Sequence, residues 1–274
     1  MTIKLKERLL DLSGPMIMGI LNVTPDSFYD GGFYDNQKKV IDQVEKMIND
    51  GASIIDIGGY SSRPGADNIS PDVELARVLP IVKLIKERFS KILISIDTFR
   101  SEVAKQCVEN GADIINDISG GSLDSKMFET VAKLNVPYII MHMRGNPSNM
   151  MDKTDYENII EEMENYFSKK IELAKSFGVN EIIIDPGFGF AKTTKQNFDI
   201  LKNLTYLKKL DKPLLVGVSR KSMIYKTLNL SPIDSLNGST VLHTISLLKG
   251  ANIIRVHDVK EANECIRLVN ELKS

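Results

Sequence analysis

The sequence predicts a (β/α)8 barrel that forms a single domain over residues 1–274. Two observations predict this fold class. A glycine followed by small residues and isoleucines recurs at Gly51, Gly111 and Gly250, and more loosely at Gly178, each time ahead of an apolar run that ends on a polar residue. The apolar runs are short and nearly continuous, which is typical of parallel strands covered on both faces. Successive copies lie far enough apart to hold two strand-plus-helix units.

Eight strands are therefore expected, alternating with eight helices. The strands are predicted at residues 16–21, 53–57, 92–96, 113–115, 138–141, 181–184, 214–218 and 252–254. Helices are clearest at residues 38–49, 73–89 and 156–177, where apolar residues recur every three or four positions. The alternative is an open doubly wound sheet, but no Gly-x-Gly-x-x-Gly turn follows the first strand, and eight units favour the closed barrel.

Composition excludes several classes of protein. A net charge of −1 gives no general attraction for nucleic acid or an anionic membrane. No apolar run approaches the roughly 18 residues that a membrane span needs. The two cysteines, Cys107 and Cys265, lie in expected helices, which argues against a disulfide framework and fits a reducing compartment. We therefore expect a soluble cytoplasmic protein with small-molecule partners.

The residues that follow the predicted strands are all polar. They are Asn22, Asp56, Asp97, Asn116, His142, Asp185, Ser219 and Arg255. One such residue is often only part of a turn, but eight in a ring indicate a functional site at this end of the barrel. Asp97, Asn116 and Asp185 suit a flat heterocycle with adjacent N–H donors, because a carboxylate accepts two parallel hydrogen bonds from a cyclic amidine.

Two basic residues, Arg255 and His257, flank Val256 at the end of the last strand. Asp258 with Glu261 resembles a capping box, which predicts a helix that begins directly after His257 and directs its free amides at the mouth of the barrel. Arg255, His257 and those amides together describe an anion pocket.

A second anion pocket is predicted in the loop GGYSSRPGA. Its glycines allow a close approach of the backbone, and Ser61, Ser62 and Arg63 offer donors. Two anion pockets beside a heterocycle pocket indicate a substrate that carries a diphosphate. His243 lies in an expected helix and is interpreted as a core or surface residue.

Several stretches resemble one known family, in order and across almost the whole chain. They are IMGILNVTPDSFYDGG, DIGGYSSRPGA, SIDTFR, GADIINDISGG, MHMRGNP, DPGFGFAKT, VGVSRKS and RVHDV. The combination of NVTPDSF, SSRPGA and DPGFGF is highly specific for the dihydropteroate synthase family. The resemblance implies a TIM barrel that joins 6-hydroxymethyl-7,8-dihydropterin diphosphate to p-aminobenzoate with Mg²⁺, releasing pyrophosphate, in folate synthesis. It also implies a homodimer and a target of sulfonamides.

The resemblance assigns roles to individual residues of this chain. The pterin is expected to bind Asp97, Asn116, Asp185 and Lys221. Asn22 is expected to meet the Mg²⁺, and the phosphates to bind Ser62, Arg63, Arg255 and His257. The p-aminobenzoate pocket is expected to comprise Phe28, Pro64, Phe190 and Ser219. The catalytic residues are expected to be Asp30, near the reacting carbon, with Lys221, Arg63 and Arg255. Tyr29 and Tyr60 depart from the family, where Ser and Glu are common.

Two other functions stay open at this point. Methyl-transfer proteins that bind tetrahydrofolate use a similar barrel with similar strand ends, although they have no use for two diphosphate pockets. A pterin-binding module without catalysis would bind the ligand and release no pyrophosphate.

Overall fold

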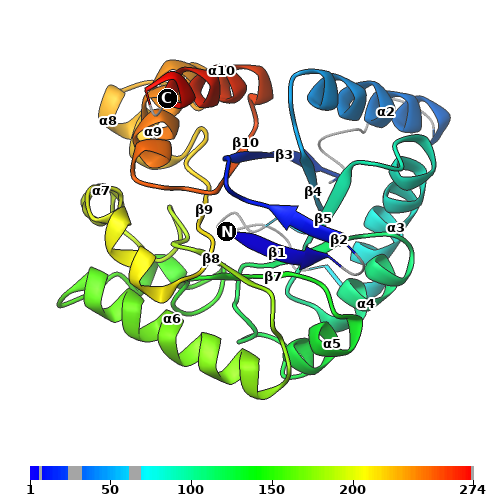
Figure 1. Cartoon of the computed structure of the whole chain (residues 1–274), viewed down its shortest axis with the longest axis horizontal. Coiled ribbons are helices and arrows are strands. Elements are labelled where there is room, and N and C mark those ends of the chain that lie inside the picture. The colour runs from blue at the N-terminus through cyan, green and yellow to red at the C-terminus, as the bar shows by residue number, and fades with distance from the viewer. Residues whose placement is uncertain (6–7, 24–32, 62–68, 273–274) are drawn as a thin grey trace.

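The computed structural model describes residues 1–5, 8–23, 33–61 and 69–272. An eight-stranded parallel sheet curls almost fully into a barrel with helices outside it (Figure 1), in the order β8-β7-β6-β5-β4-β3-β10-β9. The strands are β3 (Met16–Asn22), β4 (Ile54–Gly58), β5 (Leu93–Asp97), β6 (Ile114–Asp117), β7 (Tyr138–Met141), β8 (Ile182–Asp185), β9 (Leu215–Val216) and β10 (Ile253–Val256). A single parallel bridge between Ile184 and Leu214 joins the two ends of the sheet.

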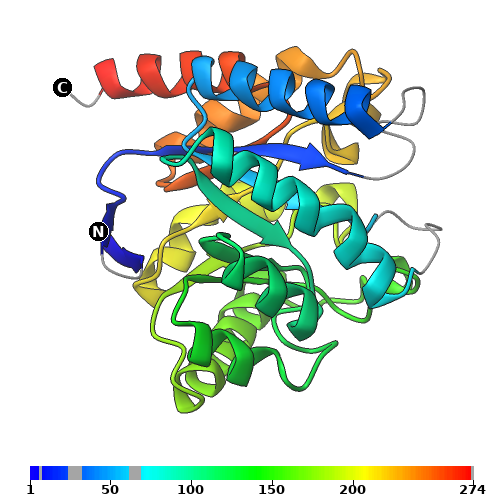
Figure 2. The same ribbon diagram turned by 90° about the vertical axis from the view of Figure 1, so that its right-hand side faces the viewer.

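The helices follow the strands along the chain and run along the outside of the sheet (Figure 2). They are α2 (Phe33–Asn49), α3 (Pro71–Arg88), α4 (Ser101–Glu109), α5 (Met127–Leu134), α6 (Ile159–Ser176), α7 (Thr194–Lys202), α8 (Ser222–Leu228), α9 (Leu236–Leu248) and α10 (Val259–Glu271), with 3-10 turns η1 (Met150–Asp152) and η2 (Leu204–Leu210). None of the described helices combines the length and the apolar character that crossing a bilayer requires.

The interior of the barrel is apolar at the end where the strands begin. Each of the eight strands contributes one buried side chain to a single cluster: Met18, Ile54, Leu93, Ile114, Ile139, Ile183, Leu215 and Ile253. A hairpin of β1 (Thr2–Leu5) and β2 (Arg8–Asp11) lies across this end (Figures 1 and 2) and adds Ile3, Leu5 and the following Leu12. The hairpin therefore closes one end of the barrel with apolar side chains.

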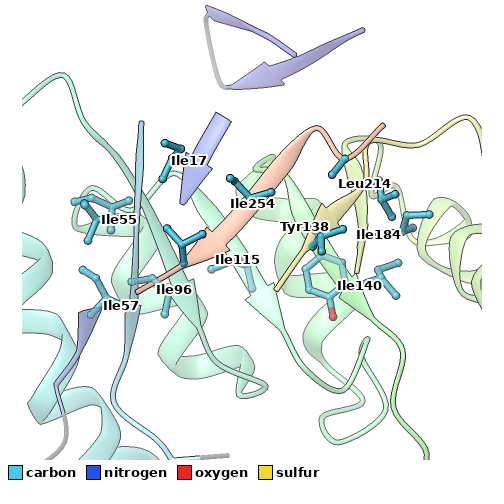
Figure 3. Packing of buried hydrophobic residues seen from close by; sticks show 14 of the residues in the cluster. Ile17, Ile55, Ile57, Ile96, Ile115, Tyr138, Ile140, Ile184, Leu214 and Ile254 are labelled. Carbon is cyan, nitrogen blue, oxygen red and sulfur yellow. The ribbon is translucent and has the colours of Figure 1, made fainter. Parts of the chain in front are cut away.

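The outer face of the sheet forms the larger core. Successive side chains of a strand point to opposite faces, so Ile55 and Ile57 of β4 face outward while Ile54 faces inward. These outward side chains pack beneath the helices together with Ile17, Ile254 and Tyr138 (Figure 3). Burial on both faces explains why the strands read as continuous apolar runs.

The recurring glycines have the conformation that a helix stop requires. Gly51, Gly111, Gly178 and Gly250 have φ of 111°, 114°, 93° and 94°. Each follows the last helical residue by two positions, at the ends of α2, α4, α6 and α9. Such positive φ values favour glycine because it has no Cβ, and the repeating unit predicted from the sequence is confirmed.

The predicted barrel is confirmed, and all eight strands lie within two residues of their predicted bounds. The polar residues were expected to follow the strands, and this was wrong for most of them, because the parallel ladder continues through them. Asn22, Asp97 and Asp185 are the last residues of their strands, and Asp56 and Asn116 lie inside theirs. The N-terminal hairpin was not predicted, and the seventh unit contains two helices, α8 and α9, rather than one.

Candidate active site

The interior of the barrel becomes polar two residues beyond the apolar layer. Side chains two positions apart on a strand point to the same face, so the residues two positions after Ile54, Leu93, Ile114, Ile183 and Ile253 also face inward. These positions hold Asp56, Ser95, Asn116, Asp185 and Arg255. The strands thus bring a polar layer together at the end of the barrel opposite the hairpin.

Arg255 lies at the centre of this layer. Its Nε donates to Asp56 Oδ2 at 2.6 Å, and its Nη2 donates to Asp97 Oδ2 at 2.8 Å. Asn116 Nδ2 donates to the same Asp56 oxygen at 3.1 Å. Within the described part of the chain, Asp56 Oδ1 and Ser95 Oγ are buried and have no hydrogen-bond partner. Because such groups are costly to leave unpaired, a polar ligand in this layer gains by binding to them.

Burial controls the charges of this layer. It raises the pKa of Asp97, to about 7, against the opposing effect of Arg255. It also raises the pKa of Asp185. Burial alone would lower the pKa of Arg255, but Asp56 and Asp97 outweigh it and raise that pKa above its ordinary value. The layer therefore combines a fixed cation with carboxyl groups that a ligand can bind either ionised or protonated.

Asp185, Lys221 and Phe190 lie on neighbouring segments of the same mouth. Asp185 Oδ1 accepts a hydrogen bond from the Gly187 amide at 2.8 Å, which orients the carboxyl group. Lys221 precedes α8, and its charge acts on Asp185. The Lys221 ammonium lies 4.5 Å from the centroid of the Phe190 ring, within the range of a cation–π contact. Cation, carboxyl group and aromatic face are thus close together.

Ser219 and His257 form a second polar pair at the mouth. Ser219 Oγ lies 3.0 Å from His257 Nδ1 and accepts the His257 backbone N–H at 3.2 Å. Loss of solvation in the protein is the larger cause that lowers the pKa of His257, and the Arg255 cation is the second. The residue nevertheless has an exposed part. At neutral pH the ring is uncharged, and a serine hydroxyl that donates to Nδ1 leaves the ring proton on Nε2.

The predicted capping box is wrong. The helix α10 does begin at Val259, close to its expected start, but the Asp258 side chain makes no cap hydrogen bond. Its two oxygens instead accept Arg220 Nε at 2.9 Å and Arg220 Nη2 at 2.7 Å. Because the Arg220 guanidinium binds the Asp258 carboxylate, this carboxylate does not cap α10. The backbone amides in the first turn of α10 therefore stay available.

Asn22 lies at the rim, at the end of β3. It pairs across the sheet with Gly58, which pairs in turn with Asp97. The Asn22 amide oxygen lies 3.5 Å from the point that a Cβ on Gly58 would occupy, so the Asn22 side chain lies directly beside Gly58. Among the described residues, no group of three His, Cys, Asp or Glu side chains is placed to hold a metal ion.

Two histidines lie apart from the site. The His142 ring packs against Tyr166 and Phe167 of α6, with ring centroids 4.8 Å and 6.2 Å away, and burial lowers its pKa well below the ordinary value. It therefore faces the helices and not the barrel mouth, although its strand end suggested otherwise. His243, interpreted from the sequence as a core or surface residue, is 1% exposed in α9 and therefore belongs to the core.

Five of the expected site residues lie outside the described part of the chain: Phe28, Asp30, Ser62, Arg63 and Pro64. Tyr29, one of the two residues that differ from the family pattern, also lies outside it. The other residue that differs from the family pattern is Tyr60. Its ring packs edge-on against Phe99, with ring centroids 5.2 Å apart, and the Arg100 guanidinium lies over both rings. Conversely, Asp56 was given no role from the sequence, although it was noted among the polar strand residues. Its spacing of two from Ile54 was the signal that it faces inward.

The fold and the polar layer define a class of protein: a barrel enzyme that binds a polar heterocycle and an anion at the ends of its strands. The family model for pterin binding enzymes matches residues 18–257. The chain is 44% identical to the dihydropteroate synthase of Escherichia coli K12 over 262 residues, which cover 95% of this chain and 92% of that protein.

Two solved structures are similarly close. The Yersinia pestis dihydropteroate synthase in complex with a sulfonamide drug has a TM-score of 0.93 and 40% identity, and the match covers 100% of this chain and 99% of that one. The Xanthomonas albilineans dihydropteroate synthase with 4-aminobenzoic acid has a TM-score of 0.92 and 33% identity, with coverage of 100% and 98%. This chain belongs to the pterin-binding enzyme family and, within it, to the dihydropteroate synthases.

Proposed function

We infer that this protein joins 6-hydroxymethyl-7,8-dihydropterin diphosphate to p-aminobenzoate, forming 7,8-dihydropteroate and pyrophosphate in folate synthesis. The observation that carries this inference is the buried cluster in which Arg255 binds Asp56 and Asp97. It lies in a chain that matches dihydropteroate synthases over almost its whole length. The membership also favours the synthase over the methyl-transfer alternative.

The pterin is proposed to bind in the polar layer. Asp185 and Asp97 offer oxygens to its adjacent N–H groups, and Asn116 offers an amide. Lys221 is proposed to reach the pterin carbonyl and a ring nitrogen, since its ammonium lies beside Asp185 and over Phe190. The unpartnered Asp56 Oδ1 would gain a partner from the ligand or from a water that the ligand orders.

The diphosphate is proposed to bind beside the pterin. Arg255 uses Nε and Nη2 for its two carboxylates, and its Nη1 makes no hydrogen bond to any described residue. The neutral His257 would add one donor from Nε2, and Ser62 and Arg63 are the further proposed ligands. Cations placed around a departing diphosphate stabilise the charge that develops as the bond to carbon breaks.

Asn22 fits the proposed Mg²⁺. Mg²⁺ commonly keeps several waters and takes only one or two protein oxygens together with substrate phosphates, so a single amide oxygen at the rim is sufficient. When bound, the ion would neutralise charge on the leaving diphosphate. Asp30 is proposed to stabilise positive charge on the reacting carbon.

p-Aminobenzoate is proposed to bind above this layer, against Phe28, Pro64, Phe190 and Ser219. Its amine is neutral at working pH, so no general base is required before it attacks the carbon. The Yersinia pestis relative was solved with a sulfonamide drug, and we expect this chain to bind the same class of compound.

We further propose that the protein is a cytoplasmic homodimer. Both cysteines are buried free thiols, which fits a reducing compartment. The helices α9 and α10 pack against each other and expose apolar side chains: Val241, Leu248, Leu268 and Leu272 are 50%, 52%, 70% and 73% exposed. Apolar side chains at this level of exposure suit a contact with a second copy.

One assay tests the proposed function. The protein is incubated with the pterin diphosphate, p-aminobenzoate and Mg²⁺, and dihydropteroate and pyrophosphate are measured. We expect both products, with strong loss when Mg²⁺ is chelated. Asp185→Asn should reduce kcat/KM about five- to 150-fold in a folded protein, because its amide turns a donor toward the pterin donors, a mismatch worth about 1–3 kcal/mol. Ligand binding without pyrophosphate would instead identify a non-catalytic pterin-binding module.

A further inference from the structure

Lys192 is buried near the site without an anionic partner. The residue is 2% exposed and follows Phe190 by two positions, in the segment between β8 and α7. None of the ion pairs between described residues includes it. A buried ammonium that lacks a carboxylate is unusual, because desolvating the charge is costly. Something else must therefore hold it.

Three backbone carbonyl groups hold the ammonium. Lys192 Nζ donates to the oxygens of His142 at 3.1 Å, Gly187 at 2.9 Å and Phe190 at 2.8 Å. These bonds use all three donors of the ammonium. One carbonyl belongs to the end of β7, and the other two belong to the loop that carries Phe190. The side chain thus fastens that loop to the barrel.

The loop has little freedom to find another position. Gly187, Gly189 and Ala191 have φ of 67°, 82° and 50°, so the chain turns at alternate residues. A Cβ on Gly187 would lie 2.3 Å from the His142 oxygen, which shows how closely the loop packs against β7. On its other side, Asn197 of α7 accepts the Gly189 amide at 2.7 Å.

We propose that Lys192 is a positioning residue that fixes the Phe190 loop and thereby shapes the p-aminobenzoate pocket. Lys192 bonds to the Phe190 carbonyl, and the Phe190 ring lies 4.5 Å from the Lys221 ammonium. Its own ammonium donates to backbone oxygens, which leaves it no hydrogen for a substrate. This inference rests on the proposed function, since it assigns Phe190 to that pocket.

The three hydrogen bonds from Lys192 depend on pH, because they require the protonated side chain. Burial lowers its pKa to about 7; the Asp185 carboxylate opposes this shift, and the Lys221 and Arg144 cations add to it. The adjacent His142 ring is neutral, because burial lowers its pKa well below the ordinary value. Above about pH 7 the neutral amine keeps two N–H donors, so one of the three carbonyl groups loses its partner.

The test compares Lys192→Met with Lys195→Met, which removes an exposed lysine from α7. Steady-state kinetics measures KM for each substrate. Lys192→Met should raise KM for p-aminobenzoate about tenfold or more and change KM for the pterin diphosphate less than about twofold, because a displaced pocket wall affects one substrate. Lys195→Met, whose side chain is 86% exposed, should change neither. Lys192→Gln gives the same comparison if the methionine variant does not fold.

Two further measurements separate positioning from a general loss of structure. In a double-mutant cycle, Lys192→Met added to Phe190→Ala should have little further effect on KM for p-aminobenzoate, since both act on one pocket wall. Between about pH 6 and pH 8, KM for p-aminobenzoate should rise in the wild type and stay flatter in Lys192→Met. Equal changes for both substrates, additive effects or identical pH profiles would overturn the proposal. A wild type that forms no dihydropteroate would instead refute the proposed function.

Discussion

At the scale of single residues, Asp56 joins side chains from three strands of the barrel. Its side chain is fully buried in the middle of β4, and one oxygen accepts from both Arg255 and Asn116. Arg255 comes from the last strand and Asn116 from β6, so this carboxylate connects three strands. A group in this position contributes to stability and to the site at the same time.

Removing Asp56 should therefore destabilise the fold. Asp56→Ala leaves the buried Arg255 with one carboxylate fewer, and breaking a buried pair from one side costs about 3–5 kcal/mol. Urea unfolding measures the free energy of unfolding. Asp199→Ala is the matched control, because its partner Lys195 is 86% exposed and such a surface pair contributes about 0.5 kcal/mol or less. A loss for Asp56→Ala no larger than for this control would show that the buried pair is not stabilising.

At the scale of secondary structure, the sequence was sufficient for the strands and insufficient for the hairpin. The eight strands are buried on both faces, so their apolar runs and preceding glycines are local signals. The hairpin lacks such a signal, because β1 alternates exposed and buried residues over only four positions and its partner surface is the barrel. The contacts of Arg255 with Asp56 and Asp97 could not be predicted from the sequence either. They join residues that are distant along the chain, and they depend on which face of each strand points inward.

The hairpin should contribute to stability and not to catalysis. Leu12 is 1% exposed in the cluster at the closed end of the barrel, so Leu12→Ala should lower the free energy of unfolding by about 2–5 kcal/mol. Leu9→Ala is the control, because Leu9 is 71% exposed and should cost about 0.5 kcal/mol or less. Both folded variants should keep the wild-type kcat/KM. A selective loss of activity in Leu12→Ala would contradict this separation of the two ends.

At the scale of the whole molecule, the two ends of the barrel have different tasks. The apolar interior and the hairpin occupy one end, and the polar layer occupies the other. Of the helices, α10 buries Val259, Ala262 and Val269 in the core, while Leu268 and Leu272, the residue after the helix, are exposed beside this buried stripe. These exposed side chains are available for assembly, because the buried residues already fulfil the packing requirement of the fold.

The proposed dimer is tested by sedimentation velocity at micromolar protein. We expect the wild type to sediment at about twice the chain mass of 30.6 kDa. Leu268→Glu should shift the protein toward the monomer, because a charge in an apolar contact must be desolvated. Leu123→Glu, at a position 39% exposed in the segment after β6, should remain dimeric. A monomeric wild type, or a Leu268→Glu variant that dimerises normally, would contradict the assignment of this face.

The pairing of β10 with β3 also determines when the site can form during synthesis. Ile253 pairs with Met16, so the first strand of the barrel obtains one of its two neighbours only after almost the whole chain has been made. A nascent chain on the ribosome therefore holds β3 as an open edge, and open edges favour incorrect pairing and aggregation. Arg255 arrives on the same late strand. Until that strand pairs, Asp56 and Asp97 lack the guanidinium that binds both of them, so the step that completes the ring also supplies the central cation of the site.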